Sequence, residues 1–156
     1  MKITIVVLTK NEEKNIERCL KSIDFCDEII VVDDYSTDNT KNQISNIKNQ
    51  NDKLNIKIFE KHLNNDFAQQ RNFGLSKASN QWVLFIDADE TVTNELKNEI
   101  ISLDTLRVSE AYYVRRRDYF WGRELKYGEI KKVREQGIIR LVKKNSGTWM
   151  GTVHEV

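Results

Sequence analysis

Three runs made up mainly of aliphatic and aromatic residues stand out in the first hundred residues of the chain. Their apolar residues do not alternate with polar ones, which is the pattern of strands buried on both faces of a sheet. The first run, ITIVVL, is rich in the β-branched residues that favour strands. The pattern therefore predicts buried strands over 3–8, 28–33 and 82–87. The segment NIKIFE predicts a further short strand over 55–60.

Between these runs, apolar residues recur with the spacing of amphipathic helices. After the first run they occupy positions i, i+3, i+4 and i+7, as Ile16, Cys19, Leu20 and Ile23. Similar stripes predict helices over 38–49, 67–78 and 94–103. Strands that alternate with helices predict an α/β fold, in which right-handed crossovers build a mostly parallel sheet with helices on both faces.

Beyond residue 104 the alternation stops. The segments EAYYVRRRDYFWG and QGIIRLVKK predict strands separated by polar loops, with no helix between them, so we expect antiparallel additions to the sheet. We interpret the aromatic cluster at 119–122 as core, with stacking on a sugar as the alternative. The triplet 115–117 is typical of a solvated face, the alternative being a grip on phosphate or anionic lipid. We expect a single domain over 1–156.

Charge and cysteine content exclude several classes of protein. The chain has 25 basic and 24 acidic residues, whereas a nucleic-acid-binding surface normally brings a basic excess. Cys19 and Cys26 form neither a zinc pattern nor a disulfide framework, which indicates reduced thiols in a cytoplasmic protein. No apolar run approaches the ~20 residues that span a bilayer.

Polar residues follow three of the four predicted strands. Because ligands of open α/β sheets bind beyond the carboxyl ends of the strands, we expect these clusters to meet at one edge. They are TKNE, DDYSTD and DADE, at 9–12, 33–38 and 87–90. Each also has a structural alternative. Thr9 and Glu12 match a helix capping box, and Asp34 and its neighbours are typical of turns and helix N-caps.

The DADE cluster is the hardest to explain as structure alone. Asp87 and Asp89 are separated by one small residue, and two nearby carboxylates raise each other's pKa unless a cation or strong donors compensate. Mg²⁺ or Mn²⁺ prefers such oxygen ligands and fills its remaining positions with water and substrate phosphates. The cluster predicts a divalent metal site, with two solvated loop acids as the alternative.

In this order, the motifs resemble those of the family 2 glycosyltransferases, which have the GT-A nucleotide-sugar-binding fold. The matching stretches are ITIVVLTKNEEKNIERCLKSI, DEIIVVDDYSTDNT, AQQRNFGLSKASNQWVLFIDADE and GTVHE. The likeness is greatest to the bacterial subgroup that adds hexoses to lipopolysaccharide-type cores. The resemblance implies transfer of a hexose from a nucleotide-diphosphate sugar, most often a UDP-sugar, to a glycan or lipid-linked acceptor.

The resemblance also assigns roles on the nucleotide side of the site. Thr9 and Glu12 would contact the nucleoside, and Asp34 would accept a hydrogen bond from the base. Arg71 would either reach the nucleotide or brace the loop around it. Tyr35 departs from the family, which commonly has glycine there, and would alter the wall of the base pocket. We interpret His62 as a surface residue.

For the chemistry, the resemblance implies a metal-dependent, inverting displacement. Asp87 would approach the ribose or the metal, and Asp89 would bind Mn²⁺ or Mg²⁺ bridging the diphosphate, where the cation stabilises the leaving group. Glu155 is the candidate base that deprotonates the acceptor hydroxyl, and His154 would orient it or bind metal.

The resemblance further implies helices beyond Glu155 that complete the acceptor site, so we expect a C-terminally shortened domain. Two other functional hypotheses stay open. One is a nucleotide-sugar-binding module without transfer activity. The other is a haloacid-dehalogenase-type phosphatase, suggested by FIDADET, whose motif normally lies on the first strand. The expected location is cytoplasmic, with peripheral contact to the membrane's inner face if the acceptor is lipid-linked.

Overall fold

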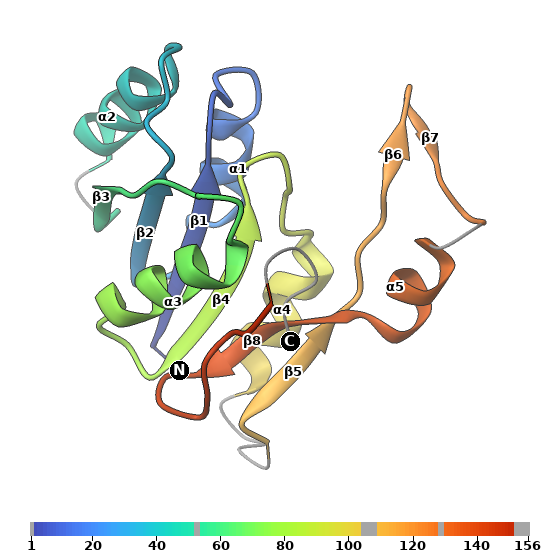
Figure 1. Cartoon of the computed structure of the whole chain (residues 1–156). Helices are drawn as coiled ribbons and strands as arrows, with labels where there is room; N and C mark the ends of the chain where they lie inside the picture. Colours follow the sequence, from blue (N-terminus) through green and yellow to red (C-terminus); the bar gives the residue numbers. More distant parts are fainter. Residues whose placement is uncertain (1, 52–53, 104–108, 128–129, 152–156) are drawn as a thin grey trace.

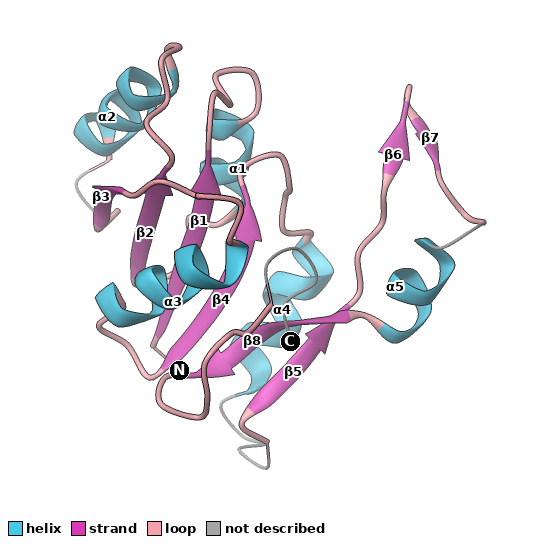
Figure 2. Ribbon diagram, viewed as in Figure 1, coloured by secondary structure: helices cyan, strands magenta, loops and turns pink. Residues whose placement is uncertain are grey.

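The computed structural model describes residues 2–51, 54–103, 109–127 and 130–151. Its centre is a six-stranded sheet with the order β3-β2-β1-β4-β8-β5 (Figures 1 and 2). The strands are β1 (Ile3–Thr9), β2 (Glu28–Asp33), β3 (Ile56–Glu60), β4 (Trp82–Asp87), β5 (Ala111–Val114) and β8 (Ile138–Lys143). The first four are parallel, as the sequence predicts, while β8 runs antiparallel to both β4 and β5.

Helices α1 (Ile16–Ser22), α2 (Thr40–Gln50), α3 (Phe67–Lys77) and α4 (Asn94–Ser102) cover both faces of this sheet, which also agrees with the prediction. A fifth helix, α5 (Ile130–Gln136), lies beyond β5 near the hairpin of residues 119–124 (Figure 1). Figure 1 shows α3 in front of the parallel strands and α1 behind them. Both cysteines are free thiols, as expected. Among the residues described, no helix has the length and apolar character needed to cross a membrane.

The two faces of β1 belong to two separate apolar clusters. Ile5 and Val7 pack with the buried residues of α1, α2 and α4, whereas Val6 and Leu8 pack with α3 and Trp149. Successive residues of a strand point to opposite faces, so a strand between two helical layers is apolar except where a buried polar side chain finds a hydrogen-bond partner. This requirement explains the run ITIVVL, whose one polar residue, Thr4, donates a hydrogen bond to Glu28.

Two expectations for the region after residue 104 are wrong. The helix α5 lies between the predicted strands, and its seven residues are too few to show a helical stripe in the sequence. The aromatic cluster is not core: Tyr119, Phe120 and Trp121 are 62%, 64% and 89% exposed. They belong to a separate two-stranded hairpin of β6 (Tyr119–Phe120) and β7 (Arg123–Glu124), which does not pair with the main sheet.

A buried carboxylate fixes the amino ends of the parallel strands. Glu28 accepts hydrogen bonds from the Thr4 hydroxyl, the Lys57 ammonium and both the amide and the hydroxyl of Ser79. Burial alone would raise its pKa, but these donors lower the pKa of Glu28 to about 2. Its two oxygens are fully used, so this acid has a structural explanation.

The close approach of α3 to β1 predicts a sensitive position. A Cβ atom on Gly74 would lie 2.4 Å from Cγ1 of Val6, so Gly74→Ala forces the helix away from the strand. We expect a loss of about 1–2 kcal/mol in the free energy of unfolding, because overpacking outweighs the higher helix propensity of alanine. Urea denaturation measures it. Gly147→Ala is the control, since nothing lies within 4 Å of its added Cβ; equal stability of the two variants would contradict the packing argument.

Candidate functional site

The carboxyl ends of β1, β2 and β4 lie side by side at one edge of the sheet. Thr9 pairs with Asp33, and Leu8 pairs with Asp87. The strand order reverses between β1 and β4, and such a switch point is where ligands of open α/β sheets bind. The three polar clusters therefore meet as the sequence predicts.

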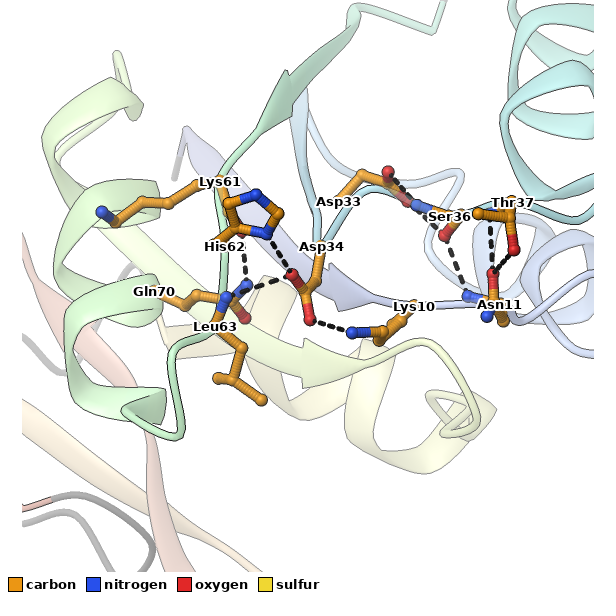
Figure 3. A network of polar contacts seen from close by, with 10 residues as sticks. All are labelled: Lys10, Asn11, Asp33, Asp34, Ser36, Thr37, Lys61, His62, Leu63 and Gln70. Atoms are coloured by element: carbon orange, nitrogen blue, oxygen red, sulfur yellow. Dashed lines mark hydrogen bonds and ion pairs between the residues drawn. The ribbon is translucent and has the colours of Figure 1, made fainter.

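The loops after β1 and β2 are tied together by side chains that accept backbone hydrogen bonds (Figure 3). The Ser36 amide donates to Oδ2 of Asp33 over 2.8 Å, and the Asn11 amide donates to Oγ of Ser36 over 2.9 Å. The Thr37 amide donates in turn to Oδ1 of Asn11 over 2.8 Å. Asn11 has a φ of 54°, a left-handed conformation that asparagine tolerates better than most residues. This network gives the two loops a fixed mutual position.

The capping box, which is the structural alternative for Thr9 and Glu12, does not form. Helix α1 has Asn15 as its N-cap, and no side chain caps it. The Glu12 amide instead donates to Oγ1 of Thr40, across the two loops, over 2.8 Å. Oγ1 of Thr9 is buried at the end of β1 and has no hydrogen-bond partner among the described residues. The long-range contacts between loops replace the local contact that the spacing suggested.

Asp34 is a buried carboxylate surrounded by donors. Oδ2 accepts from Nζ of Lys10 over 2.7 Å, and Oδ1 accepts from the Leu63 amide over 3.2 Å. Nδ1 of His62 lies 3.3 Å from Oδ1. Burial by itself would raise the pKa of Asp34, but Lys10, Leu63 and His62 together hold it below the ordinary value. The carboxylate is therefore charged at neutral pH and available as an acceptor.

An aromatic pair forms a wall beside Asp34. The rings of Tyr35 and His62 are stacked, with centroids 4.0 Å apart and planes inclined by 26°. Tyr35 has a φ of 49°, which is uncommon for a residue with a bulky side chain and explains why glycine suits this position better. His62 is 63% exposed, as a surface residue should be, yet it also contacts Asp34 and Tyr35.

Asp87 lies between two arginines from different elements. Its Oδ1 is 3.4 Å from Nη2 of Arg71 in α3, and its Oδ2 is 3.1 Å from Nη2 of Arg140 in β8. Burial, and then repulsion from Arg140, lower the pKa of Arg71 to about 10, so it stays charged at neutral pH. Arg71 thus braces Asp87, and the two cations neutralise a charge that the sequence analysis gave to a metal ion.

Glu90 extends this cluster. Its Oε2 accepts from the Asp87 amide over 2.9 Å, and its Oε1 lies 3.6 Å from both Arg140 and Arg116. Burial and the neighbouring Asp87 raise the pKa of Glu90, against the opposing charge of Arg140. Sequence reasoning missed Arg140 and Lys10, because an arginine inside a strand and a lysine after one carry no local signal of a site.

Asp89 differs from Asp87 in its surroundings. It is exposed, and its carboxylate has no ion-pair partner within the described part of the chain. The described residues contain no group of three or more His, Cys, Asp or Glu side chains arranged to hold a metal. Glu155 and His154, the candidate base and its neighbour, lie outside the described residues, so their roles stay predictions.

A comparison with protein families supplies the decisive observation. The model of the family described as "Glycosyl transferase family 2" matches residues 4–149, which include all of the sheet except Ile3 and all three polar clusters. The chain belongs to glycosyl transferase family 2. Membership argues against the phosphatase hypothesis, because FIDADET lies within the matched residues and begins on β4, not on the first strand.

Two curated relatives show how much of a family 2 enzyme this chain covers. The SPbeta prophage-derived glycosyltransferase SunS of Bacillus subtilis (strain 168) is 41% identical over 99 residues, which cover 63% of this chain and 22% of SunS. The GalNAc(5)-diNAcBac-PP-undecaprenol beta-1,3-glucosyltransferase of Campylobacter jejuni is 36% identical over 119 residues, which cover 71% of this chain and 36% of that protein. The chain thus spans only a minor part of the length of both relatives.

Solved structures confirm the expected GT-A fold class. S. aureus TarS 1-349 in complex with UDP-GlcNAc superposes with a TM-score of 0.66 at 29% identity, over 80% of this chain and 37% of that one. The mannosyltransferase PcManGT from Pyrobaculum calidifontis, in complex with GDP-Man and Mn²⁺, gives a TM-score of 0.62 at 27% identity, over 74% of this chain and 36% of that one. The mostly parallel sheet with antiparallel additions is the shared architecture.

The arginine cluster of this family 2 domain predicts a stability effect. Arg140→Met leaves Asp87 and Glu90 with less positive charge in a largely buried setting, so we expect a loss of about 2–3 kcal/mol in the free energy of unfolding. Urea denaturation at neutral pH measures it. Arg115→Met, at an exposed position, is the control. In the double variant Arg140→Met, Asp87→Asn we expect less than the sum of the two single losses; strict additivity would show that the two side chains are not coupled.

Proposed function

We propose that this domain binds a nucleoside-diphosphate sugar, UDP-hexose by preference, and that the protein transfers the hexose to a glycan or lipid-linked acceptor in the cytoplasm. The observation that carries the proposal is the meeting of Asp34, Asp87 and Asp89 at the switch point of the sheet. The ligands named for the superposed structures, UDP-GlcNAc and GDP-Man, support this class of donor.

Asp34 is the proposed acceptor for the base. A carboxylate offers about four lone-pair positions. The described contacts use them for Lys10, Leu63 and His62, which leaves room for one more donor, such as the N3–H of uracil. Lys10 is 59% exposed, so its ammonium is free to follow the carboxylate or turn toward a phosphate. Thr9 and Glu12, at the end of β1, are the proposed contacts to the rest of the nucleoside.

The residues present fit a divalent cation held mainly by Asp89. Mg²⁺ and Mn²⁺ at nucleotide sites use one or two protein carboxylates, while waters and phosphate oxygens complete the coordination. Asp89 has the exposed, unpaired carboxylate that this role needs, and Asp87 is already compensated by Arg71 and Arg140. When bound, the cation would stabilise the charge that develops on the departing diphosphate. The Mn²⁺ complex of PcManGT supports a metal of this class.

Residues of the chain itself position the donor and deprotonate the acceptor in this proposal. Arg71 holds Asp87 beside the ribose, and the loop network after β1 and β2 keeps the nucleoside contacts in place. Glu155 is proposed to take the proton of the acceptor hydroxyl during an inverting displacement, with His154 beside it. The alternative is a module that binds the donor without catalysing transfer. The observation that favours it is that the chain matches only 22% to 36% of the length of the two relatives.

The metal role predicts that Asp89→Asn removes only the metal-dependent part of UDP binding. We expect UDP affinity in Mn²⁺ to fall about tenfold or more, to the metal-free level, because one charged ligand is lost. Calorimetric titration of UDP with and without Mn²⁺ measures both levels. Asp24→Asn, an exposed acid that pairs with Lys97, is the matched control. Unchanged Mn²⁺-dependent affinity in Asp89→Asn would remove the metal role.

The base contact predicts a different pattern for Asp34→Asn. A hydrogen bond to a charged acceptor is lost, so affinity for uridine alone should fall by about tenfold or more, with and without metal. Titrations of uridine and UDP against wild type and variant test this. If only UDP binding weakens, Asp34 acts through Lys10 on the phosphates and not on the base.

Turnover separates an enzyme from a binding module. We expect slow release of UDP from a UDP-hexose in Mn²⁺ even without an acceptor, and its loss in Asp89→Asn. Tight binding of the donor with no UDP release at all would favour the binding module.

A further inference from the structure

The β6–β7 hairpin stands apart from the rest of the domain. Its two strands pair only with each other, and Figure 1 shows the hairpin beyond β5, with its tip directed the same way as the carboxyl ends of the parallel strands. The base of the hairpin is held by the Leu125 amide, which donates to the Asp118 carbonyl over 2.8 Å, and by an ion pair between Arg134 and Glu124. The tip is therefore supported but not covered by the residues described.

The tip displays aromatic side chains at a conformational cost. Phe120 pairs with Arg123, so the turn consists of Trp121 and Gly122, with φ angles of 51° and 73°. Two-residue turns with positive φ at both positions favour Asn-Gly, whereas a bulky residue there is strained. Trp121 is nevertheless 89% exposed, and Phe120 is 64% exposed. The Trp121 ring contacts only the neighbouring, also exposed Phe120 ring among the aromatic residues described, so burial does not explain the strain, and strain of this kind suggests a function.

Basic residues are concentrated in the part of the sequence that contains the hairpin. Residues 115–134 contain eight lysines and arginines and three acids, although the whole chain carries a net charge of only +1. Arg115, Arg117 and Arg123 are exposed, and no described acid forms an ion pair with any of them. Arg116 and Arg134, in contrast, are paired with acids of the domain. Of these three arginines, Arg123 pairs with Phe120 next to the tip, and Arg115 and Arg117 lie in the segment that leads from β5 into the hairpin.

We propose that this hairpin binds an anionic membrane surface, with Phe120 and Trp121 in the headgroup region and the three arginines facing the lipid phosphates. Aromatic rings favour the membrane–water interface, and basic residues near them are attracted to anionic lipids. One such signal alone gives weak binding, whereas an apolar and an electrostatic signal together give stable attachment. The hairpin combines both, and its orientation brings the carboxyl edge of the sheet toward the membrane.

Charge argues against a second copy of the chain as the partner. A symmetric dimer through this hairpin would bring the same arginines face to face, since such interfaces use identical patches. The inference is independent of the proposed transfer reaction, because it uses no residue of the donor site. A membrane-bound hairpin is equally consistent with an enzyme and with a binding module.

Tryptophan fluorescence reports the contact directly. Trp82 and Trp149 are 5% and 8% exposed, so a spectral change on adding vesicles belongs to Trp121. We expect a blue shift with vesicles of phosphatidylglycerol and phosphatidylcholine, quenching by brominated lipid, and little change with phosphatidylcholine alone. No shift, or an equal shift with both vesicles, would overturn the proposal.

Variants separate the apolar contribution to membrane binding from the electrostatic contribution. Trp121→Asn suits the turn, so the fold is kept, and cosedimentation with anionic vesicles should fall about tenfold or more through the lost apolar burial. The triple variant Arg115→Gln, Arg117→Gln, Arg123→Gln should lose roughly fivefold per arginine. Ile101→Gln, which removes an apolar side chain that is 54% exposed on α4, is the control and should bind like wild type.

Binding of Trp121→Asn at the wild-type level would overturn the membrane assignment. So would a wild-type dimer in analytical ultracentrifugation that Trp121→Asn abolishes, because the hairpin would then serve a second copy. Circular dichroism of each variant establishes that a loss of binding is not a loss of fold.

Discussion

The pairing of β1 with both β2 and β4 is the constraint on which the rest of this structure depends. Parallel strands end at the same edge, so the register that pairs Thr9 with Asp33 and Leu8 with Asp87 also decides which polar residues meet. The apolar clusters on the two faces of β1 maintain that register, because a slip by one residue would exchange the side chains between the two helical layers. The site is thus a consequence of core packing.

Charge compensation within the chain is the second organising feature. Asp34 is neutralised by Lys10, and Asp87 by Arg71 and Arg140, which come from other elements. The adjacent acids of the DADE segment therefore do not require a shared cation to coexist. Asp87 and Asp89 divide into an acid that the protein holds and an acid that is exposed to solvent. The spacing of the two acids suggests that both would bind a metal ion, whereas this difference in surroundings leaves, of the two, only the Asp89 carboxylate without a charge partner among the described residues.

The domain has a hydrogen-bonded part around the parallel strands and a projecting hairpin with different chemistry. Around the parallel strands, hydrogen bonds between loops fix Asn11, Ser36 and Thr37 in place. The hairpin after β5 contributes nothing to the two apolar clusters and displays its aromatic residues outward. Recognition of a small ligand needs side chains held in a fixed geometry, whereas contact with a surface needs exposed side chains. The loops after β1 and β2 meet the first requirement, and the hairpin meets the second.

The sequence by itself determined the α/β architecture, the bounds of the first eight elements to within about two residues, and the meeting of the three polar clusters. These features follow from local apolar periodicity and from the rule that parallel strands share an edge. Only the tertiary structure decided that Thr9 and Glu12 do not cap a helix, that Arg140 and Lys10 hold the acids, and that Phe120 and Trp121 are exposed. Each of these depends on contacts between residues far apart in the chain, or on their absence, and local patterns carry no information about such contacts.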